Sequence, residues 1–488
     1  MTKEAGEVNS SVETNEAHMR RVLLSLVGVA LLVNYVETMV IPGIPTIQNH
    51  FNSTDTLSSW ISSAYLITGA GASMLLGKLG DSYGKKKMFL VSLSFYIVGV
   101  GVAGFSPSMY FLIFARALQG IGFAIIPLSL AIVSETFPRE RIGMAQGIIS
   151  ATFAIGATIG LILGSYVVED LGWQYAFHTA VVLSLVLFVI VAKVLRKDTN
   201  MVKRRMDYLG AAILIAGVTL VLVYITEGPT LGWLSLEELG FLIPGLALAF
   251  YFFMFERNKA DPLMHLKLLR VRNVLVANMV GIFSMLTMFL VFFAITYYSQ
   301  LPSGFGLGLT VIQAGLTMGP AAVGMLVVGP LIGKLLPRSG PKPVLFASAG
   351  IIALGLAMFI LNRATRTDTV IDLFVCLAGM VGVIVPIVNM IAIAVPREDL
   401  AIGMGMNTML RNIGGAIGPV VATSVMSTYT KPLIKVINGH PVAVATLPSA
   451  FAFNLVFAIG IALTFCMMAF ALATKNYTFK KAESTPPS

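Results

Sequence analysis

Long apolar runs alternate with short polar segments along the whole chain, and this pattern predicts its architecture. Most runs approach the roughly 20 residues that a helix needs to cross a hydrocarbon layer about 30 Å thick. Strands of a membrane barrel would instead give segments of about ten residues with alternating apolar and polar positions. We therefore predict an all-α polytopic membrane protein. Its fourteen predicted transmembrane helices lie at 22–44, 58–79, 88–106, 109–134, 142–168, 175–195, 208–227, 239–256, 273–299, 309–336, 343–361, 370–395, 400–428 and 450–474.

The composition agrees with this pattern and excludes several classes of function. The chain is 57% hydrophobic and 11% charged, whereas a soluble domain carries about 25% charged residues. Its two cysteines, Cys376 and Cys466, lie in apolar runs and lack metal-ligand spacing. The sequence has no phosphate-binding GxxxxGK(S/T) loop and no loop long enough for a soluble catalytic domain. We expect no enzymatic activity, no cofactor and no bound metal.

The net charge of +10 is a topology signal rather than a sign of nucleic-acid binding. If the N-terminus is cytoplasmic, most of the 33 Lys and Arg residues fall on the same side of the membrane. The opposite loops hold only Arg363, Arg366, Lys431 and Lys435. Because Lys and Arg concentrate in cytoplasmic loops, we expect both termini to lie in the cytoplasm and the protein to lie in the plasma membrane.

Three short segments recur in the same order in the second part of the chain. GKLGDSYGKKKMF at 77–89 is matched by GKLLPRSGPKPVL at 333–345, and GATIGLILG at 156–164 by GGAIGPVVA at 414–422. The tripeptide PRE recurs with nearly the same separation. An even number of helices separates the copies, so both halves have one orientation. Parallel halves are typical of transporters with a site near the membrane midplane.

The repeat divides the chain into predicted parts. Within the first of them, residues 1–18 are polar and acidic, which predicts a disordered segment. The parts are a cytoplasmic tail at 1–21, a six-helix bundle at 22–200, a linker with two extra helices at 201–272, a second six-helix bundle at 273–475 and a cytoplasmic tail at 476–488.

One acidic residue interrupts the first apolar run. Glu37 lies 16 residues after Arg21, which is about 24 Å along a helix and inside the hydrocarbon layer. An acid there costs about 2.5–3.5 kcal/mol and usually faces a cavity or a partner. Such a carboxyl group can bind either a proton or a cation, as an antiporter requires. The alternative is a neutral structural acid, hydrogen-bonded to Asn34 one turn earlier.

Several motifs resemble those of the major facilitator superfamily. GKLGDSYGKKK (Gly77–Lys87) resembles the signature loop after the second helix of that superfamily, and RALQGIG (Arg116–Gly122) resembles its fourth-helix motif. Fourteen predicted helices, with GPTLGW at 228–233 and FERNKADPL at 255–263, are similar to its drug:proton antiporter branch. The stretch around Glu37 is most similar to the fourteen-helix tetracycline exporters. The resemblance implies the major facilitator fold, with two six-helix bundles and two inserted helices.

Arg116 and Gln119 belong to the second of these motifs. An arginine stays charged inside the membrane and needs a partner. The resemblance implies that Arg116, together with Gln119, helps to move protons to and from Glu37. The alternative is a structural arginine that caps carbonyl groups at a helix break.

The signature loop implies a conformational latch. Gly77 and Gly84 permit tight backbone turns. In the superfamily the loop acid, here Asp81, meets a helix N-terminus of the other half. A base four residues later pairs with an acid at the end of the fourth helix, which implies Lys85 with Glu135 and an outward-open state stabilised by this pair. The alternative is a solvated basic turn that serves topology.

The fifth predicted helix carries Gly156, Gly160 and Gly164, which form a smooth face for close helix packing. This face resembles part of the superfamily's antiporter motif. Leu161 and Ser165 stand where that motif has proline and its last glycine, so proton coupling other than antiport stays open. A purely structural face is an equal alternative.

A last polar cluster lies in the thirteenth predicted helix. Arg411 is flanked by Asn407 and Asn412 in an otherwise apolar and small-residue run. Arg411 either contacts a substrate or closes the inner gate, or it anchors packing near the inner side of the membrane.

These features together predict a proton-coupled secondary transporter that exports small amphipathic, drug-like and potentially cationic compounds by alternating access. The expected partners are a small-molecule substrate, protons and the lipid bilayer, without nucleic acid, and we expect a monomer. The alternatives are a metabolite uniporter or symporter, a tetracycline–metal exporter, and a non-transporting membrane sensor.

Overall fold

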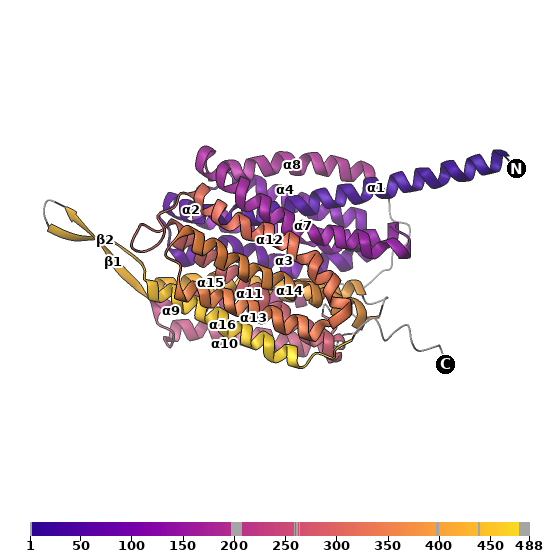
Figure 1. The fold of residues 1–488 in the computed structure, drawn as a ribbon. Coiled ribbons are helices and arrows are strands. Elements are labelled where there is room, and N and C mark those ends of the chain that lie inside the picture. Colours follow the sequence, from indigo (N-terminus) through magenta and orange to yellow (C-terminus); the bar gives the residue numbers. More distant parts are fainter. Residues whose placement is uncertain are drawn as a thin grey trace.

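The computed structural model describes residues 2–196, 207–257, 259, 262, 264–396, 400–437 and 440–477. Residues 197–206, around the start of the predicted linker, and 478–488, in the predicted C-terminal tail, lie outside this part. The helices run side by side in a long bundle (Figure 1). We call the end at which α1 begins and α16 ends the terminal end, and the opposite end, from which a β-hairpin extends, the hairpin end.

The described residues form sixteen α-helices, two of which continue a preceding helix after a short 3-10 turn. The helices are α1 (Thr2–Met39), α2 (Ile44–His50), α3 (Asp55–Tyr83), α4 (Lys85–Ala103), α5 (Met109–Ile121), α6 (Ile125–Thr136), α7 (Arg139–Tyr166), α8 (Trp173–Val194), α9 (Tyr208–Leu231), α10 (Leu236–Arg257), α11 (Arg272–Gln300), α12 (Val311–Ser339), α13 (Pro341–Leu361), α14 (Arg366–Ala394), α15 (Leu400–Thr428) and α16 (Ala450–Leu472).

Helices occupy all of the predicted transmembrane ranges. Within the described residues, twelve helices are long and apolar enough to cross a membrane. The two that fall short are α3 and α15, which pack against each other in the interior of the bundle. Protein rather than lipid surrounds much of their surface, so polar residues such as Ser59 and Ser63 can be buried there. The count of fourteen transmembrane helices therefore stays a prediction.

The first predicted span is broken shortly after Glu37. α1 ends at Met39, the 3-10 turn η1 (Ile41–Gly43) follows, and α2 begins at Ile44. Pro42 lies in this turn, and proline has no backbone N–H for a continuous helix. The Pro42 carbonyl oxygen accepts a hydrogen bond from Nε2 of Gln300 on α11 at 2.8 Å. The break thus joins the first helix to the second half of the chain.

The repeated glycine segments pack in the same way in both halves. A Cβ atom at Gly160 on α7 would lie 2.5 Å from the Tyr35 carbonyl oxygen on α1. A Cβ atom at Gly418 on α15 would lie 2.5 Å from the Leu286 carbonyl oxygen on α11. Such distances are too short for nonbonded atoms, so only glycine permits this approach of two helices. In each half, the helix that carries the repeated glycines therefore packs tightly on the first helix of that half, α7 on α1 and α15 on α11.

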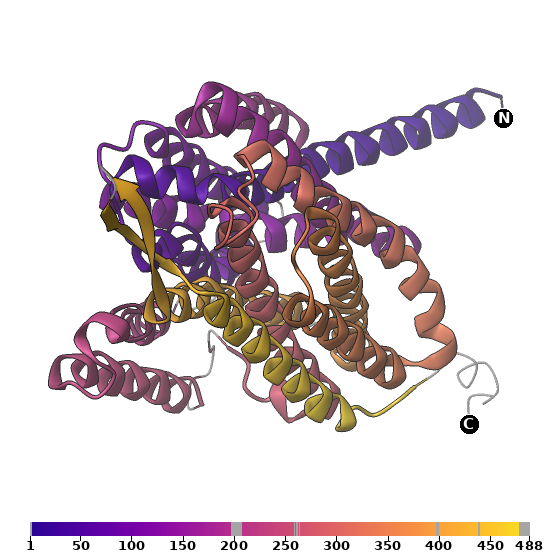
Figure 2. The same ribbon diagram turned by 60° about the vertical axis from the view of Figure 1, so that its left-hand side comes forward.

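The inserted helices α9 and α10 lie beside both halves. They pack on each other, and α9 also packs on α3 and α15. Nε1 of Trp60 on α3 donates a hydrogen bond to Oγ1 of Thr226 on α9 at 2.9 Å. Figure 2 shows this pair of helices at one edge of the bundle. The insert therefore covers the line along which α3 and α15 meet.

The N-terminal segment is helical from Thr2, which corrects our prediction of a disordered segment at 1–18. α1 begins at Thr2 and extends beyond the bundle at the terminal end (Figure 1). Glu16 forms an ion pair with Arg141 of α7, with 3.0 Å between Oε1 and Nη1. Extension of an existing helix is favourable because it avoids the cost of nucleating a new one, and the segment contains four glutamates, which favour helices.

A β-hairpin adds two strands to the predicted all-α architecture. β1 (Thr430–Ile437) pairs antiparallel with β2 (His440–Pro448), and Ile437 lies opposite His440. The strands extend from the hairpin end between α15 and α16 (Figure 1). Asn438 and Gly439 lie outside the described residues, but Asn-Gly is the preferred sequence of a two-residue hairpin turn. This dipeptide was the sequence signal that our prediction missed.

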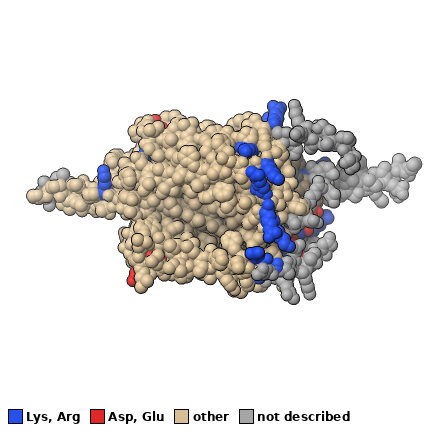
Figure 3. All heavy atoms as spheres, turned by 90° about the horizontal axis from the view of Figure 1, so that it is seen from below, with Lys and Arg blue, Asp and Glu red and all other residues tan. Residues whose placement is uncertain are grey.

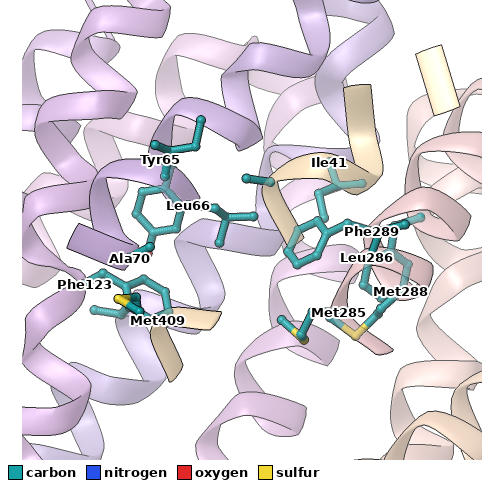
Figure 4. Packing of buried hydrophobic residues seen from close by; sticks show 14 of the residues in the cluster. Ile41, Tyr65, Leu66, Ala70, Phe123, Met285, Leu286, Met288, Phe289 and Met409 are labelled. Atoms are coloured by element: carbon teal, nitrogen blue, oxygen red, sulfur yellow. The ribbon is translucent and has the colours of Figure 1, made fainter. Parts of the chain in front are cut away.

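The core joins both halves through apolar and sulfur-containing side chains. Figure 4 shows side chains of α3, α11 and α15 in one packed cluster, including Tyr65, Leu66, Met285, Phe289 and Met409. All five are buried. Methionine is unbranched and polarizable, so it fills irregular gaps between helices. The two halves therefore meet through an adaptable apolar surface.

Candidate functional site

Glu37 lies in the last turn of α1 and is only 3% exposed. Its neighbour Thr38 fixes the position of α1, because Thr38 Oγ1 lies 3.5 Å from the Gly156 carbonyl oxygen and 3.4 Å from the Ala157 carbonyl oxygen on α7. Within the described part of the chain, no hydrogen bond or ion pair holds the Glu37 carboxylate. A buried carboxylate without a partner is available to exchange a proton or to bind a ligand.

Arg116 lies on α5 and is completely buried. Its Nε donates to the Ile61 carbonyl oxygen at 2.9 Å, and its Nη1 donates to Oε1 of Gln119 at 2.6 Å. The guanidinium lies over the Tyr65 ring, 4.5 Å from its centroid. Nη2 has no hydrogen-bond partner, and neither does Nε2 of Gln119. Arg116 and Gln119 are therefore together, as predicted, and one side of the guanidinium stays free.

Arg411 lies on α15, in the second half of the chain. Its Nη2 donates to Sδ of Met285 on α11 at 3.5 Å, whereas its Nε is buried and has no partner. Asn407 Nδ2 donates to Oδ1 of Asn278 at 3.2 Å, and Asn412 Nδ2 has no partner. The guanidinium therefore lies inside the bundle without a paired acid, a costly arrangement that packing alone does not explain.

Glu37, Arg116 and Arg411 form one electrostatic cluster that spans both halves. The positive charges of Arg116 and Arg411 both act on the Glu37 carboxyl group. None of the ion pairs between described side chains joins these three residues. Protonation of Glu37 would remove a negative charge on which both arginines act, and it would thereby change the electrostatic interaction between the two halves.

Asn34 is not a partner of Glu37. Its Nδ2 donates to the Ala30 carbonyl oxygen at 2.8 Å and to Oγ1 of Thr152 on α7 at 3.2 Å. The alternative of a structural acid held by Asn34 is therefore wrong, because the amide is turned toward α7. Asn34 instead helps to hold α1 and α7 together.

The predicted latch residues do come together at the terminal end. Lys85 Nζ forms ion pairs with Glu135 and with Asp81, the latter at 3.4 Å from Oδ1. Gly84 has a φ of +96°, which only glycine adopts readily, and it ends α3 one residue before Lys85 begins α4. A Cβ atom at Gly77 would meet no other atom within 4 Å, so packing does not require glycine there. Among the described side chains, Asp81 forms its ion pair with Lys85 of the same loop.

The glycine face of α7 packs on α1 along its length. Cβ atoms at Gly156 and Gly164 would overlap atoms of α1, as a Cβ atom at Gly160 would. At Gly164 the Cβ atom would lie 2.5 Å from Cβ of Met39. Another side of α7 meets the second half, where a Cβ atom at Gly315 on α12 would lie 2.5 Å from the Leu161 carbonyl oxygen. α7 is thus packed tightly between the helix that carries Glu37 and the other half.

A set of polar contacts at the hairpin end was not predicted. Tyr297 Oη on α11 donates to Oε1 of Gln48 on α2 at 2.6 Å, and Gln48 Nε2 donates to Oδ1 of Asp55 at 2.5 Å. The backbone N–H of Ile312 donates to Oε2 of Glu169 at 2.6 Å. These contacts join the two halves at this end. Polar residues at helix ends look like ordinary loop residues in a sequence, so their pairing carried no signal.

Asp372 is another buried acid that was not predicted from the sequence. Asp372 lies in the second turn of α14, is 2% exposed, and has no hydrogen-bond partner at Oδ2. No ion pair of Asp372 is found among the described side chains. The residue stands near the start of a predicted span, where an acid looks like a helix-terminal residue rather than an intramembrane one.

Comparisons with known proteins agree with this fold. The sequence profile of the Major Facilitator Superfamily matches residues 26–419. Multidrug resistance protein Stp of Mycobacterium tuberculosis (strain CDC 1551 / Oshkosh) is 30% identical over 420 residues, which cover 84% of this chain and 77% of that protein. Multidrug transporter protein MdtP of Bacillus subtilis (strain 168) is 24% identical over 383 residues, which cover 78% of this chain and 70% of that protein.

Solved structures show the same fold at low sequence identity. The crystal structure of a D-xylose–proton symporter superposes with a TM-score of 0.65 at 14% identity, and the match covers 94% of this chain and all (100%) of that chain. At this identity the likeness concerns the fold alone.

Proposed function

Because this chain belongs to the Major Facilitator Superfamily, we propose that it exports small amphipathic, drug-like compounds in exchange for protons. Members of this family are transporters, so the protein is a secondary transporter and not an enzyme. The printed names of two relatives, a multidrug resistance protein and a multidrug transporter, support drugs as the substrate class. The observation that carries the proton coupling is the buried Glu37 carboxyl group, on which the charges of two arginines from different halves act.

In the proposed cycle Glu37 binds a proton when the halves are open toward the outside. The loss of its negative charge leaves Arg116 and Arg411 unbalanced, which favours the next rearrangement of the halves. Arg116 has a free Nη2 with which it can approach Glu37 and displace the proton toward the cytoplasm. Substrate binds when the carboxylate is free and leaves when the proton returns. Gln119 acts as a positioning residue, because it holds the opposite side of the guanidinium.

Alternating access then requires contacts that open at one end while others hold at the opposite end. At the hairpin end the Gln48–Tyr297 and Glu169–Ile312 contacts join the halves and would break on opening. At the terminal end the ion pairs of Lys85 with Asp81 and Glu135 lie within the first half, where they would keep α3, α4 and α6 together while that half moves. A cycle that breaks and re-forms the hairpin-end contacts moves the halves as rigid bodies.

The substrate class follows from the surface between the halves. Buried methionine and aromatic side chains lie where α3, α11 and α15 contact one another (Figure 4). Such an adaptable apolar surface suits flat or branched apolar compounds of varied shape. Two arginines and one acid give the cluster a net positive charge. A cationic compound would depend on Glu37 for its binding, whereas neutral amphipathic compounds would not.

We also propose the finer features that the sequence predicts. The chain crosses the plasma membrane fourteen times, with the terminal end in the cytoplasm, and it works as a monomer. The six-helix bundles at 22–200 and 273–475 are the moving halves, and the linker at 201–272 supplies the two inserted helices. The close approach of α7 to α1 and of α15 to α11 supports this division.

Proton-driven efflux in proteoliposomes tests the proposal. Purified protein is reconstituted, a pH gradient is imposed, and the movement of a panel of fluorescent lipophilic dyes and of tetracycline is measured. Glu37→Gln should abolish uphill, gradient-driven transport while it leaves downhill exchange measurable. Glu237→Gln, at an exposed acid of α10, is the matched control and should transport normally.

Three outcomes would contradict the proposal. Unchanged uphill transport by Glu37→Gln would remove the assigned role of this acid. Substrate accumulation in the direction of proton flow, measured in vesicles of both orientations, would indicate a symporter. Ligand binding without any flux in the wild type would indicate a sensor.

A further inference from the structure

A basic pocket lies at the terminal end of the second half, away from the Glu37 cluster. Its volume is about 460 Å³. The turn η4 (Leu268–Arg270) and the start of α11 form one wall, the end of α14 forms another, and the chain that follows α16 forms the third. The lining residues are Arg270, Val271, Arg272, Asn273, Ala394 and Lys475. Three of these six side chains are cationic, and none is acidic.

The wall that carries Lys475 is held firmly on α11. Asn273 Nδ2 donates to the Lys475 carbonyl oxygen at 3.0 Å, and the Lys475 backbone N–H donates to Asn273 Oδ1 at 2.8 Å. Arg272 Nε donates to the carbonyl oxygen of Ala473. Two residues after Lys475, Tyr477 Oη donates to Oδ1 of Asn389 on α14 at 2.9 Å. The segment after α16 therefore has a fixed path, and the pocket is built before any ligand arrives.

The charges in this pocket are not neutralised by the described protein. None of the ion pairs between described side chains involves Arg270, Arg272 or Lys475, and all three side chains are exposed. Figure 3 shows that Lys and Arg side chains gather in a band near the terminal end of this face of the bundle. Three convergent cations at a pocket attract an anion with several oxygen atoms, such as a phosphate group.

The position of the pocket favours an amphiphilic anion as its ligand. Arg272 begins α11 and Leu472 ends α16, and both helices are long and apolar enough to cross a membrane. The cationic groups therefore lie where the apolar surface of the bundle ends, which is the level of lipid headgroups. Beside them Leu472 is 57% exposed and Leu275, one turn into α11, is 38% exposed. These side chains offer contact to an acyl chain that a free phosphate ion could not use.

We propose that this pocket binds the phosphate headgroup of an anionic phospholipid, whose acyl chains follow Leu275 and Leu472. Arg272 and Asn273 position the segment that carries Lys475, while Arg270 and Lys475 supply the exposed charges. The lipid would tie the end of α16 to the start of α11 and hold the terminal end of the second half together. This inference does not depend on the substrate or on proton coupling.

Native mass spectrometry of the full-length protein in detergent tests the site. The protein is titrated with phosphatidylglycerol, with phosphatidylcholine of the same acyl chains, and with inorganic phosphate. Arg270→Gln/Lys475→Gln should weaken phosphatidylglycerol binding about thirtyfold, since each cation contributes about 1 kcal/mol, or about fivefold in affinity. Arg338→Gln/Lys334→Gln removes the same two charges from exposed positions of α12 and should bind as the wild type does. Arg270→Lys/Lys475→Arg keeps the charges and should retain most of the binding.

The same samples distinguish a bound lipid from a free anion and from general surface attraction. Thermal unfolding in detergent should shift upward with phosphatidylglycerol in the wild type and not in the Arg270→Gln/Lys475→Gln variant. An equal shift with inorganic phosphate would overturn the lipid assignment in favour of a free anion. Equal loss of binding in the α12 control would overturn the site, because it would show general surface attraction. Equal binding of phosphatidylcholine would show that charge plays no part and would also overturn it.

Discussion

Gly160→Ala is the sharpest test of how α7 positions the helix that carries Glu37. A Cβ atom at this position would lie 2.5 Å from the Tyr35 carbonyl oxygen and would also overlap Oγ1 of Thr38. Both atoms belong to α1, and neither is the far end of a flexible side chain. The two helices would therefore have to separate, and the Glu37 carboxyl group would move with α1.

The expected cost is the difference between two opposing contributions. Overpacking of a tight interface costs about 1–3 kcal/mol, whereas alanine in place of glycine favours a helix by up to about 1 kcal/mol. Gly147 lies on the same helix, and a Cβ atom there would meet nothing within 4 Å. Gly147→Ala should therefore gain the higher helix propensity of alanine without a steric overlap. Because the helical gain is common to both variants, we expect their free energies of unfolding to differ by the overpacking cost of about 1–3 kcal/mol, with Gly160→Ala the less stable.

Equilibrium unfolding in mixed detergent micelles measures this difference, and proteoliposome efflux measures its consequence. Gly160→Ala should lose most proton-driven transport, while Gly147→Ala should transport as the wild type does. If both variants unfold alike and both transport normally, α1 and α7 do not approach each other this closely, and the account of how Glu37 is positioned fails.

Two further predictions concern charged residues outside the central cluster. A double-mutant cycle with Lys85→Gln and Glu135→Gln should give a coupling of a few tenths to about 1 kcal/mol in unfolding free energy, because Glu135 is half exposed; zero coupling would contradict this ion pair. Asp372→Asn should be at least as stable as the wild type in thermal unfolding at pH 8, since an unpaired buried carboxylate costs several kcal/mol. A clear loss of stability would instead show that the carboxylate has a partner.

The helices of this protein could be predicted from sequence because their signal is local. An apolar run of about 20 residues has few alternatives to a membrane helix, and the structure has a helix at each predicted range. The disorder at 1–18 was predicted incorrectly because the polar composition of this segment was considered without the helix that follows it. Its helix is continuous with the apolar part of α1, so its conformation depends on a neighbouring segment.

The site residues could be predicted from sequence only where a charged residue lies within an apolar run. Glu37, Arg116 and Arg411 are charged residues in apolar runs. In the structure, the charges of both arginines act on the Glu37 carboxyl group. The signature loop was predictable for a different reason, because Asp81, Lys85 and Glu135 lie at the ends of adjacent helices.

Contacts between distant segments were not predictable, and they include those that join the halves. Gln48 and Tyr297 pair at the hairpin end although each looks ordinary in sequence. Asp372 differs from Glu37 only in its place along the helix, near the start rather than deep within the run. Burial of Asp372 comes from the helices packed around α14, which no local pattern encodes. A charge in the middle of an apolar run therefore identifies a site from sequence, whereas a charge near its end requires the packed structure.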